Sequence, residues 1–174
     1  EPPTGDPMRH FMHHSEPGDQ ASPIYRHLNR GKRIANLDLK SDNGKQVLTR
    51  LIAGADILLE SFRPGVLARL GFDRETLDKI NPSLILCSLS GYGQNGPYRF
   101  RAGHDVNYCS LTSMHTLKAS ADRPVIGFPP LADHAGAMQA SIAMLAALHA
   151  RNKNDSGAFL DISLFESSLS WQYL

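Results

Sequence analysis

Leu84-Ile85-Leu86-Cys87-Ser88-Leu89 is the stretch of sequence that decides the fold. A nearly continuous apolar run of this length is typical of a strand that is covered on both faces. A second such run, Asp56-Ile57-Leu58-Leu59-Glu60, precedes it, and residues with helical spacing separate the two. Strand, helix and strand in this order predict parallel strands with right-handed crossovers. We therefore expect an α/β fold built on a doubly wound, Rossmann-like parallel sheet.

The same alternation continues on both sides of these runs. Upstream, the pattern predicts a strand over residues 33–39 and a helix over residues 42–54. Ser41 is the expected N-cap of this helix. Further helices are expected from Val66 to Leu70 and over residues 73–80, 105–118 and 133–150, followed by a strand over residues 159–163 and a helix from Leu164. Met138, Ile142, Leu145 and Leu148 line one face of the 133–150 helix, with alanines between them.

Ligands of doubly wound sheets bind beyond the carboxyl ends of the strands. Three segments fall at such ends in this chain: Lys40, Ser61-Phe62-Arg63 and Gly91-Tyr92-Gly93. The pattern alone therefore predicts a binding site where these segments meet.

Composition limits the class of protein. The 174 residues are 41% hydrophobic, which is enough for one domain with a sizeable core, preceded by a loop-rich leader over residues 1–30. Lys and Arg number 18 against 17 Asp and Glu, so we expect no nucleic acid and no membrane surface as a partner. Cys87 and Cys109 lie in apolar runs, which indicates buried, reduced thiols in a cytoplasmic protein. Because the chain begins without Met and stops inside an expected helix, we expect a domain that is truncated at both ends.

Two residues in separate loop regions are candidates for acid–base chemistry. His104 follows a Gly/Pro-rich loop, and Asp133 opens the 133–150 helix. Each also has a structural interpretation, because Asp at a helix start caps free N–H groups and a lone His often has a structural role. Together, an imidazole and a carboxylate from facing loops would form a two-base site.

A metal site is not expected. His10, His13 and His14 form a His-x-x-His-His run, but no third kind of ligand and no helical spacing accompany it. A solvated loop is the simpler interpretation.

Five segments in order resemble the class III CoA-transferase superfamily, which includes the α-methylacyl-CoA racemases. They are Glu1-Pro2-Pro3-Thr4-Gly5-Asp6, Asn29-Arg30-Gly31-Lys32-Arg33 with Leu37-Asp38-Leu39-Lys40, Glu60-Ser61-Phe62-Arg63-Pro64-Gly65, Gly103-His104-Asp105-Val106-Asn107-Tyr108 and Leu131-Ala132-Asp133. The resemblance covers essentially the whole chain. It implies a CoA-binding α/β domain that is a fragment of the large domain of this fold, and an interlocked homodimer.

The resemblance implies an enzyme acting on CoA thioesters, with two alternatives for its chemistry. In the racemases, His104 and Asp133 would be the acid–base pair that moves the α-proton of a 2-methylacyl-CoA. The positive start of the Asp133 helix would help to stabilise the enolate oxygen. In the CoA-transferases, Asp133 would instead attack an acyl-CoA and carry acyl and CoA intermediates. The His104-Asp105 pair, where transferases carry a Tyr-Glu type pair, favours the racemase.

The resemblance also implies how CoA is held, as part of the substrate and not as a tightly bound cofactor. The implied contacts are Leu37, Lys40, Ser61, Phe62 and Arg69, with Asp105 and Tyr108 at the pantetheine and thioester end. A chain of this extent leaves a third alternative open, in which it only binds CoA or a partner subunit without turnover.

Overall fold

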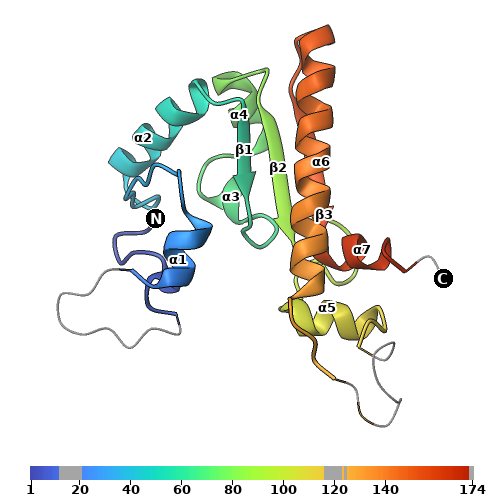
Figure 1. Ribbon diagram of the computed structural model, residues 1–174. Coiled ribbons are helices and arrows are strands. Elements are labelled where there is room, and N and C mark those ends of the chain that lie inside the picture. Colours follow the sequence, from blue (N-terminus) through green and yellow to red (C-terminus); the bar gives the residue numbers. More distant parts are fainter. Residues whose placement is uncertain (12–20, 116–122, 124, 173–174) are drawn as a thin grey trace. The chain divides into compact units, whose positions relative to one another are not determined.

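The structure is a computed structural model that describes residues 1–11, 21–115, 123 and 125–172 (Figure 1). The chain divides into two compact units, Glu1–Leu51 and Ile52–Leu174. The expectation of one domain over residues 1–174 therefore stays a prediction.

Three short helical segments lie in the described part of the first unit. They are the 3-10 helix η1 (Pro7–His10), the helix α1 (Pro23–Leu28) and most of the helix α2 (Asp42–Ala53). The expected cap of α2 is confirmed, because the Ser41 hydroxyl oxygen accepts a hydrogen bond from the Gly44 N–H at 3.0 Å. Ser22 caps α1 in the same manner, accepting from the Tyr25 N–H at 3.1 Å.

The strand expected over residues 33–39 was a wrong prediction. This segment has no regular secondary structure. Its backbone reaches Glu1: the Leu37 N–H donates to the Glu1 carbonyl oxygen at 2.8 Å, and the Glu1 amino group donates to the Ala35 carbonyl oxygen at 2.7 Å. Contact with a single residue does not build a ladder, because a ladder needs successive paired residues on a neighbouring strand.

Three parallel strands form the sheet of the second unit. They are β1 (Ile57–Glu60), β2 (Ile85–Ser90) and β3 (Ala158–Ser163), with β2 in the centre. Ile85 pairs with Ile57 on one side and with Ala158 on the other. All three strands coincide with runs recognised in the sequence, so the parallel sheet is confirmed.

The central strand of this sheet is buried on both faces, as expected for a doubly wound fold. The side chains of β2 alternate between the two faces, because successive residues of a strand point in opposite directions. Cys87 packs with Ile162 of β3 against Ala140 of the long helix α6 (Leu131–Asn154). On the opposite face, Leu86 lines a groove together with Leu67 of the helix α3 (Val66–Arg69). Cys87 and Cys109 are both free thiols and fully buried, as expected.

Three further helices lie in the described part of the second unit. They are α4 (Arg74–Ile80), α5 (Asp105–Leu111) and α7 (Leu164–Leu169). The helix expected over residues 105–118 was therefore too long. It ends because Ser113 adopts a left-handed backbone with φ of 61° and the Thr112 hydroxyl bonds back to the Tyr108 carbonyl oxygen at 3.0 Å. Residues 116–118 of that prediction lie outside the described residues.

The helix α6 packs on the sheet through its small residues. Ala132, Ala135 and Ala140 are buried, and a Cβ added at Gly136 would lie 2.2 Å from Leu164 Cδ2 of α7. The large apolar side chains that the sequence placed on one face of the helix, Met138, Ile142 and Leu145, are 56%, 59% and 66% exposed. Small residues here permit close approach of the helix to β2, β3 and α7.

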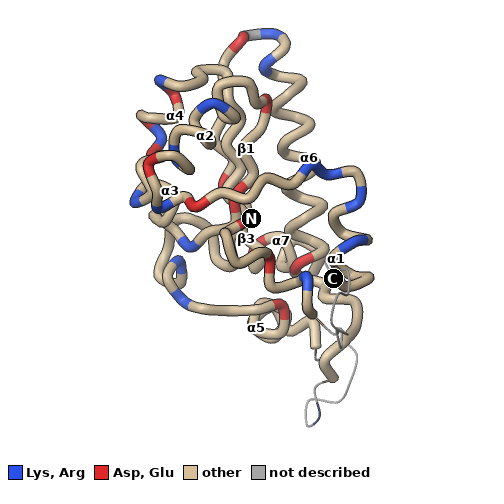
Figure 2. The backbone as a smooth tube through the Cα atoms, turned by 90° about the vertical axis from the view of Figure 1, so that its left-hand side faces the viewer, with Lys and Arg blue, Asp and Glu red and all other residues tan. Residues whose placement is uncertain are grey.

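Charged residues are interspersed along the backbone of both units (Figure 2), as the near-neutral balance of the sequence indicated. Over the part of the chain that the structure describes, no helix is long and apolar enough to cross a membrane.

Candidate active site

A cleft of about 440 Å³ lies beyond the carboxyl ends of β1 and β2. Its walls come from the segments that follow these strands and from the first turns of α5, α6 and α7. The lining residues used below are Ser61, Phe62 and Arg63 after β1, Gly91, Arg99, Arg101 and Gly103 after β2, and His104, Tyr108 and Asp133 at the helices. The two catalytic candidates therefore line the same cleft.

His104 lies at the start of α5 and lines the cleft. Its backbone N–H donates to the Asn107 side-chain oxygen at 2.9 Å, which is one half of a capping box. His104 is an exposed residue that lines the cleft, and a capping box joins it to Asn107. The structural role considered for His104 is therefore present at this position, and the residue also borders the cleft.

Asp133 also presents its carboxylate to the cleft. It is the third residue of α6, and the cap position belongs to Pro130, so Asp133 is not the N-cap. Desolvation by the surrounding protein raises its pKa above the ordinary 3.8, and the negative charge of Asp105 raises it further. His134 and His104 act in the opposite direction. A carboxyl group with a raised pKa holds a proton more readily near neutral pH, which suits acid–base work.

Asp105 is the residue that caps α6. Its Oδ1 atom accepts the Ala132 N–H at 2.7 Å and the Asp133 N–H at 3.1 Å. Two of the free N–H groups at the start of α6 are therefore already bonded to a carboxylate. The expectation that the start of this helix stabilises an enolate oxygen is not supported, because Asp105 occupies these donors.

Asp105 is also absent from the residues that line the cleft. Its Oδ2 atom faces the Cys109 thiol, which donates to it at 3.6 Å. The CoA contact implied for Asp105 stays a prediction.

Tyr108 is held in a slot between two glycines. A Cβ added at Gly91 would lie 2.2 Å from the Tyr108 hydroxyl oxygen, and one added at Gly103 would lie 2.7 Å from Tyr108 Cε1. The Tyr92 ring packs edge-on against it at 5.1 Å between centroids. Tyr108 is 4% exposed, and burial raises the pKa of its hydroxyl, with Tyr92 and Asp133 adding to the rise. The hydroxyl is therefore a neutral hydrogen-bond donor at the wall of the cleft.

The other implied CoA contacts fall into three groups. Ser61 and Phe62 line the cleft, and the Phe62 N–H is held by the Glu60 carboxylate at 2.7 Å. Arg69 lies at the end of α3, beside Gly65, and does not line it. Leu37 and Lys40 belong to the first unit, and their relation to the cleft stays a prediction.

Three arginines line the cleft. Arg63 belongs to the Ser61-Phe62-Arg63 segment that the sequence placed at a strand end, whereas Arg99 and Arg101 were not predicted as site residues. Arg63 follows β1, and Arg99 and Arg101 lie in the loop that leads to His104. The Arg101 guanidinium lies 4.7 Å from the centre of the Tyr98 ring, and that of Arg99 lies 4.4 Å from the centre of the Phe100 ring. Stacking of this kind orients guanidinium groups without neutralising them. Their position after the ends of strands was the signal that could have identified them.

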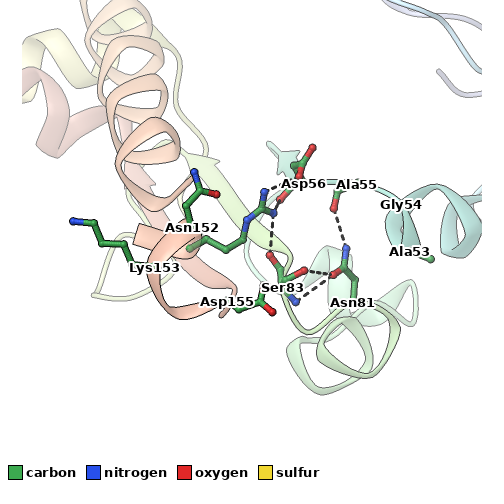
Figure 3. Close-up of a pocket in the computed structure, with 10 residues that line it drawn as sticks. Ala53, Gly54, Ala55, Asp56, Asn81, Ser83, Asn152, Lys153 and Asp155 are labelled. Carbon is green, nitrogen blue, oxygen red and sulfur yellow. Dashed lines mark hydrogen bonds and ion pairs between the residues drawn. The ribbon is translucent and has the colours of Figure 1, made fainter. Parts of the chain in front are cut away.

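A larger depression of about 830 Å³ lies at the opposite ends of the strands and has another character (Figure 3). Several of its polar groups bond to residues of neighbouring elements. The Asn81 amide nitrogen donates to the carbonyl oxygens of Ala55 at 2.9 Å and Ile52 at 3.0 Å, and Ser83 donates to the Asn81 side-chain oxygen at 3.0 Å. Arg151 donates to the Asp56 carboxylate at 2.6 Å. These bonds join secondary-structure elements to one another.

The geometry can be compared with known proteins. The whole chain, residues 1–174, matches CoA-transferase family III. The chain belongs to this family. It is 40% identical to the alpha-methylacyl-CoA racemase of Mus musculus over 155 residues, covering 83% of this chain and 40% of the racemase. It is 36% identical to the acetyl-CoA:oxalate CoA-transferase of Acetobacter aceti over 156 residues, covering 88% of this chain and 40% of the transferase.

A solved structure supports the same assignment. The fold is similar to that of a CAIB/BAIF family protein from Brucella suis, with a TM-score of 0.90 and 33% identity, over 98% of this chain and 46% of that chain. The chain of this family III member thus spans less than half the length of each of these three proteins. The α/β fold expected from the resemblance is confirmed.

No group of three or more His, Cys, Asp or Glu side chains is placed to hold a metal ion within the described residues. His13 and His14 of the His-x-x-His-His run lie outside them.

Proposed function

We propose that this chain carries the acid–base pair of an enzyme that acts on acyl-CoA thioesters, and that it moves the α-proton of a 2-methylacyl-CoA. The observation that carries the proposal is that His104 and Asp133, both exposed residues, line one cleft. Both groups are therefore available to a substrate.

The proposed reaction is a proton exchange at one carbon. A base on one face removes the α-proton, and the electron pair of the C–H bond moves into the thioester to form an enolate. An acid on the other face then delivers a proton to the same carbon, and the C–H bond re-forms with inverted configuration. The imidazole of His104 and the carboxyl of Asp133 exchange the roles of base and acid between the two enantiomers.

The cleft also offers groups suited to the rest of an acyl-CoA. Arg63, Arg99 and Arg101 supply positive charge for phosphate groups, and Phe62 supplies apolar surface for pantetheine or adenine. We propose CoA as part of the substrate and no tightly bound cofactor.

The alternative is a CoA-transferase in which Asp133 is the nucleophile. The observation in its favour is that the carboxylate is open to the cleft, as attack on a thioester requires. The similarity to an acetyl-CoA:oxalate CoA-transferase supports the alternative, and the similarity to a racemase supports the first proposal. The imidazole of His104 makes the proton-transfer reaction our first choice.

Incubation of the full-length protein with 2-methylacyl-CoA in D₂O distinguishes the proton-transfer reaction from the CoA-transferase reaction. Deuterium at the α-carbon, lost in His104→Ala, supports proton transfer. Absence of exchange together with a hydroxylamine-sensitive acyl group on Asp133 would replace it with the transferase. Tight CoA binding without either product would indicate that the protein binds CoA without turnover.

The interlocked homodimer and the cytoplasmic location implied by the resemblance stay predictions. Sedimentation of the full-length protein tests the first, and fractionation of the cells that produce it tests the second.

A further inference from the structure

One carboxylate connects the two catalytic candidates. Asp105 directly follows His104 at the start of α5, so its backbone moves with that residue. Its Oδ1 atom bonds to the backbone of Asp133 at 3.1 Å and to that of Ala132 at 2.7 Å. The Asp105 side chain therefore links His104 and Asp133 in space, although the two residues are far apart in the sequence.

The same side chain is itself held in place. Its second oxygen accepts from the Cys109 thiol, one turn further along α5, at 3.6 Å. Cys109 is fully buried and packs with Tyr108 and Ala132. The Asp105 carboxylate thus lies between the first turns of two helices, with one oxygen directed to each.

We propose that Asp105 is a positioning residue that fixes the Asp133 carboxylate relative to the His104 imidazole, and that its role in the reaction is exerted through Asp133. This inference rests on the proposed function for its catalytic consequence. It differs from the CoA contact that the family resemblance implies.

Asp105 also has an electrostatic effect on its neighbour. Asp133 is surrounded by Asp105 and His104 at the start of α5, by Tyr108 one turn further along, and by His134 on its own helix. Asp105 is the one of these groups whose charge raises the pKa of Asp133. Replacing that charge with a neutral amide should lower the pKa of Asp133 toward its ordinary value.

Two substitutions separate the contact from the charge. Asp105→Asn keeps an oxygen at the position that accepts both N–H groups but removes the negative charge. Asp105→Ala removes both. The matched control is Asp73→Asn, because Asp73 caps α4 by accepting the Thr76 N–H at 2.8 Å and lies away from the cleft.

Three measurements on the full-length protein test the proposal. Carbon-13 NMR titration of the Asp133 carboxyl should give a lower pKa in Asp105→Asn and no change in Asp73→Asn. Amide hydrogen exchange at Ala132 and Asp133 should accelerate by about tenfold in Asp105→Ala, as expected for one lost hydrogen bond. Proton exchange into 2-methylacyl-CoA should fall by on the order of a hundredfold in kcat for Asp105→Ala, with a smaller change in KM.

The outcomes are distinguishable. A raised KM with unchanged kcat, unchanged amide exchange and an unchanged Asp133 titration would overturn the proposal and make Asp105 a CoA contact. If the NMR and amide measurements change as expected while the wild-type protein shows no α-proton exchange, the positioning role stands and the proposed proton transfer fails. Asp105→Asn retains the acceptor oxygen, so the titration remains measurable if Asp105→Ala does not fold.

Discussion

The Arg151 guanidinium donates to the Asp56 carboxylate at 2.6 Å and thereby joins the last turns of α6 to the residue that precedes β1. The same guanidinium donates to the Ser83 carbonyl oxygen at 3.3 Å, just before β2. Its side chain is 15% exposed, although that of Asp56 is 76% exposed. This contact lies at the end of the sheet opposite the cleft, so it stabilises the helix without touching the reaction.

Arg151→Ala should lower the free energy of unfolding by about 1–3 kcal/mol, because charge-assisted bonds to two other segments are lost. The matched control is Lys153→Ala, which removes an exposed cation from the same end of α6 and should have little effect. Denaturant unfolding measures both. Equal stabilities of the two variants would contradict the role given to Arg151.

Asp133→Asn should stabilise the folded protein at neutral pH while removing proton transfer. Because the pKa of Asp133 is raised above 3.8, the folded state binds more protons than the unfolded state just above that pH. Stability therefore falls as pH rises from 3.8 through the folded pKa, and a neutral amide avoids this loss.

Denaturation midpoints measured from pH 3 to pH 8 would show this difference as a flatter profile for Asp133→Asn. Parallel profiles for the two proteins would mean that burial and Asp105 do not raise the pKa of Asp133.

Glu1 should make the first unit sensitive to acid. Hydrogen bonds from Arg9, at 2.9 and 3.0 Å, and from Tyr25 lower the pKa of the Glu1 carboxyl from 4.5 to about 2. The stabilisation is present above pH 4.5 and is lost as pH falls toward 2, because the folded state resists protonation in that window.

Amide NMR signals of residues 1–11 and 21–51 followed over this pH range provide the measurement. In Glu1→Gln the transition should disappear from the window between pH 4.5 and 2. A transition that persists unchanged would assign the acid sensitivity to another carboxyl group.

Gly91→Ala should displace Tyr108, because the added Cβ would lie 2.2 Å from the Tyr108 hydroxyl oxygen. Overpacking of this kind costs about 1–3 kcal/mol of stability. The matched control is Gly54→Ala, where nothing lies within 4 Å of the added Cβ.

Combining Gly91→Ala with Tyr108→Leu should restore part of the lost stability, since the shorter side chain vacates the hydroxyl position. Thermal denaturation of the two single variants and the double variant checks this. Additive losses would show that Gly91 and Tyr108 do not share the slot.

The sequence predicted those parts of the fold in which local pattern and tertiary packing agree. The apolar run at residues 84–89 became the central strand, because both of its faces are covered. The run at residues 33–39 looked similar, but a strand also needs a partner, and the sequence of one segment does not contain that information. Likewise, helical periodicity after residue 105 gave no sign of the left-handed backbone at Ser113.

The sequence indicated the candidate acid–base residues of the site, but not the contacts that hold them in place. His104 and Asp133 could be selected because their residue types suit proton transfer. The cap that Asp105 provides could not, because its partners Ala132 and Asp133 come close only after folding. The close approach of Gly91 and Tyr108 could not be predicted either, because these residues are separated in the sequence and meet only after folding.

Among the described residues, the sheet contributes only Leu89 and Ser90 to the cleft, whereas the candidate acid and base, His104 and Asp133, lie at the starts of helices. A lineage built on this scaffold can therefore exchange one chemistry for another by altering a handful of positions there, while selection for folding continues to act on the strands undisturbed.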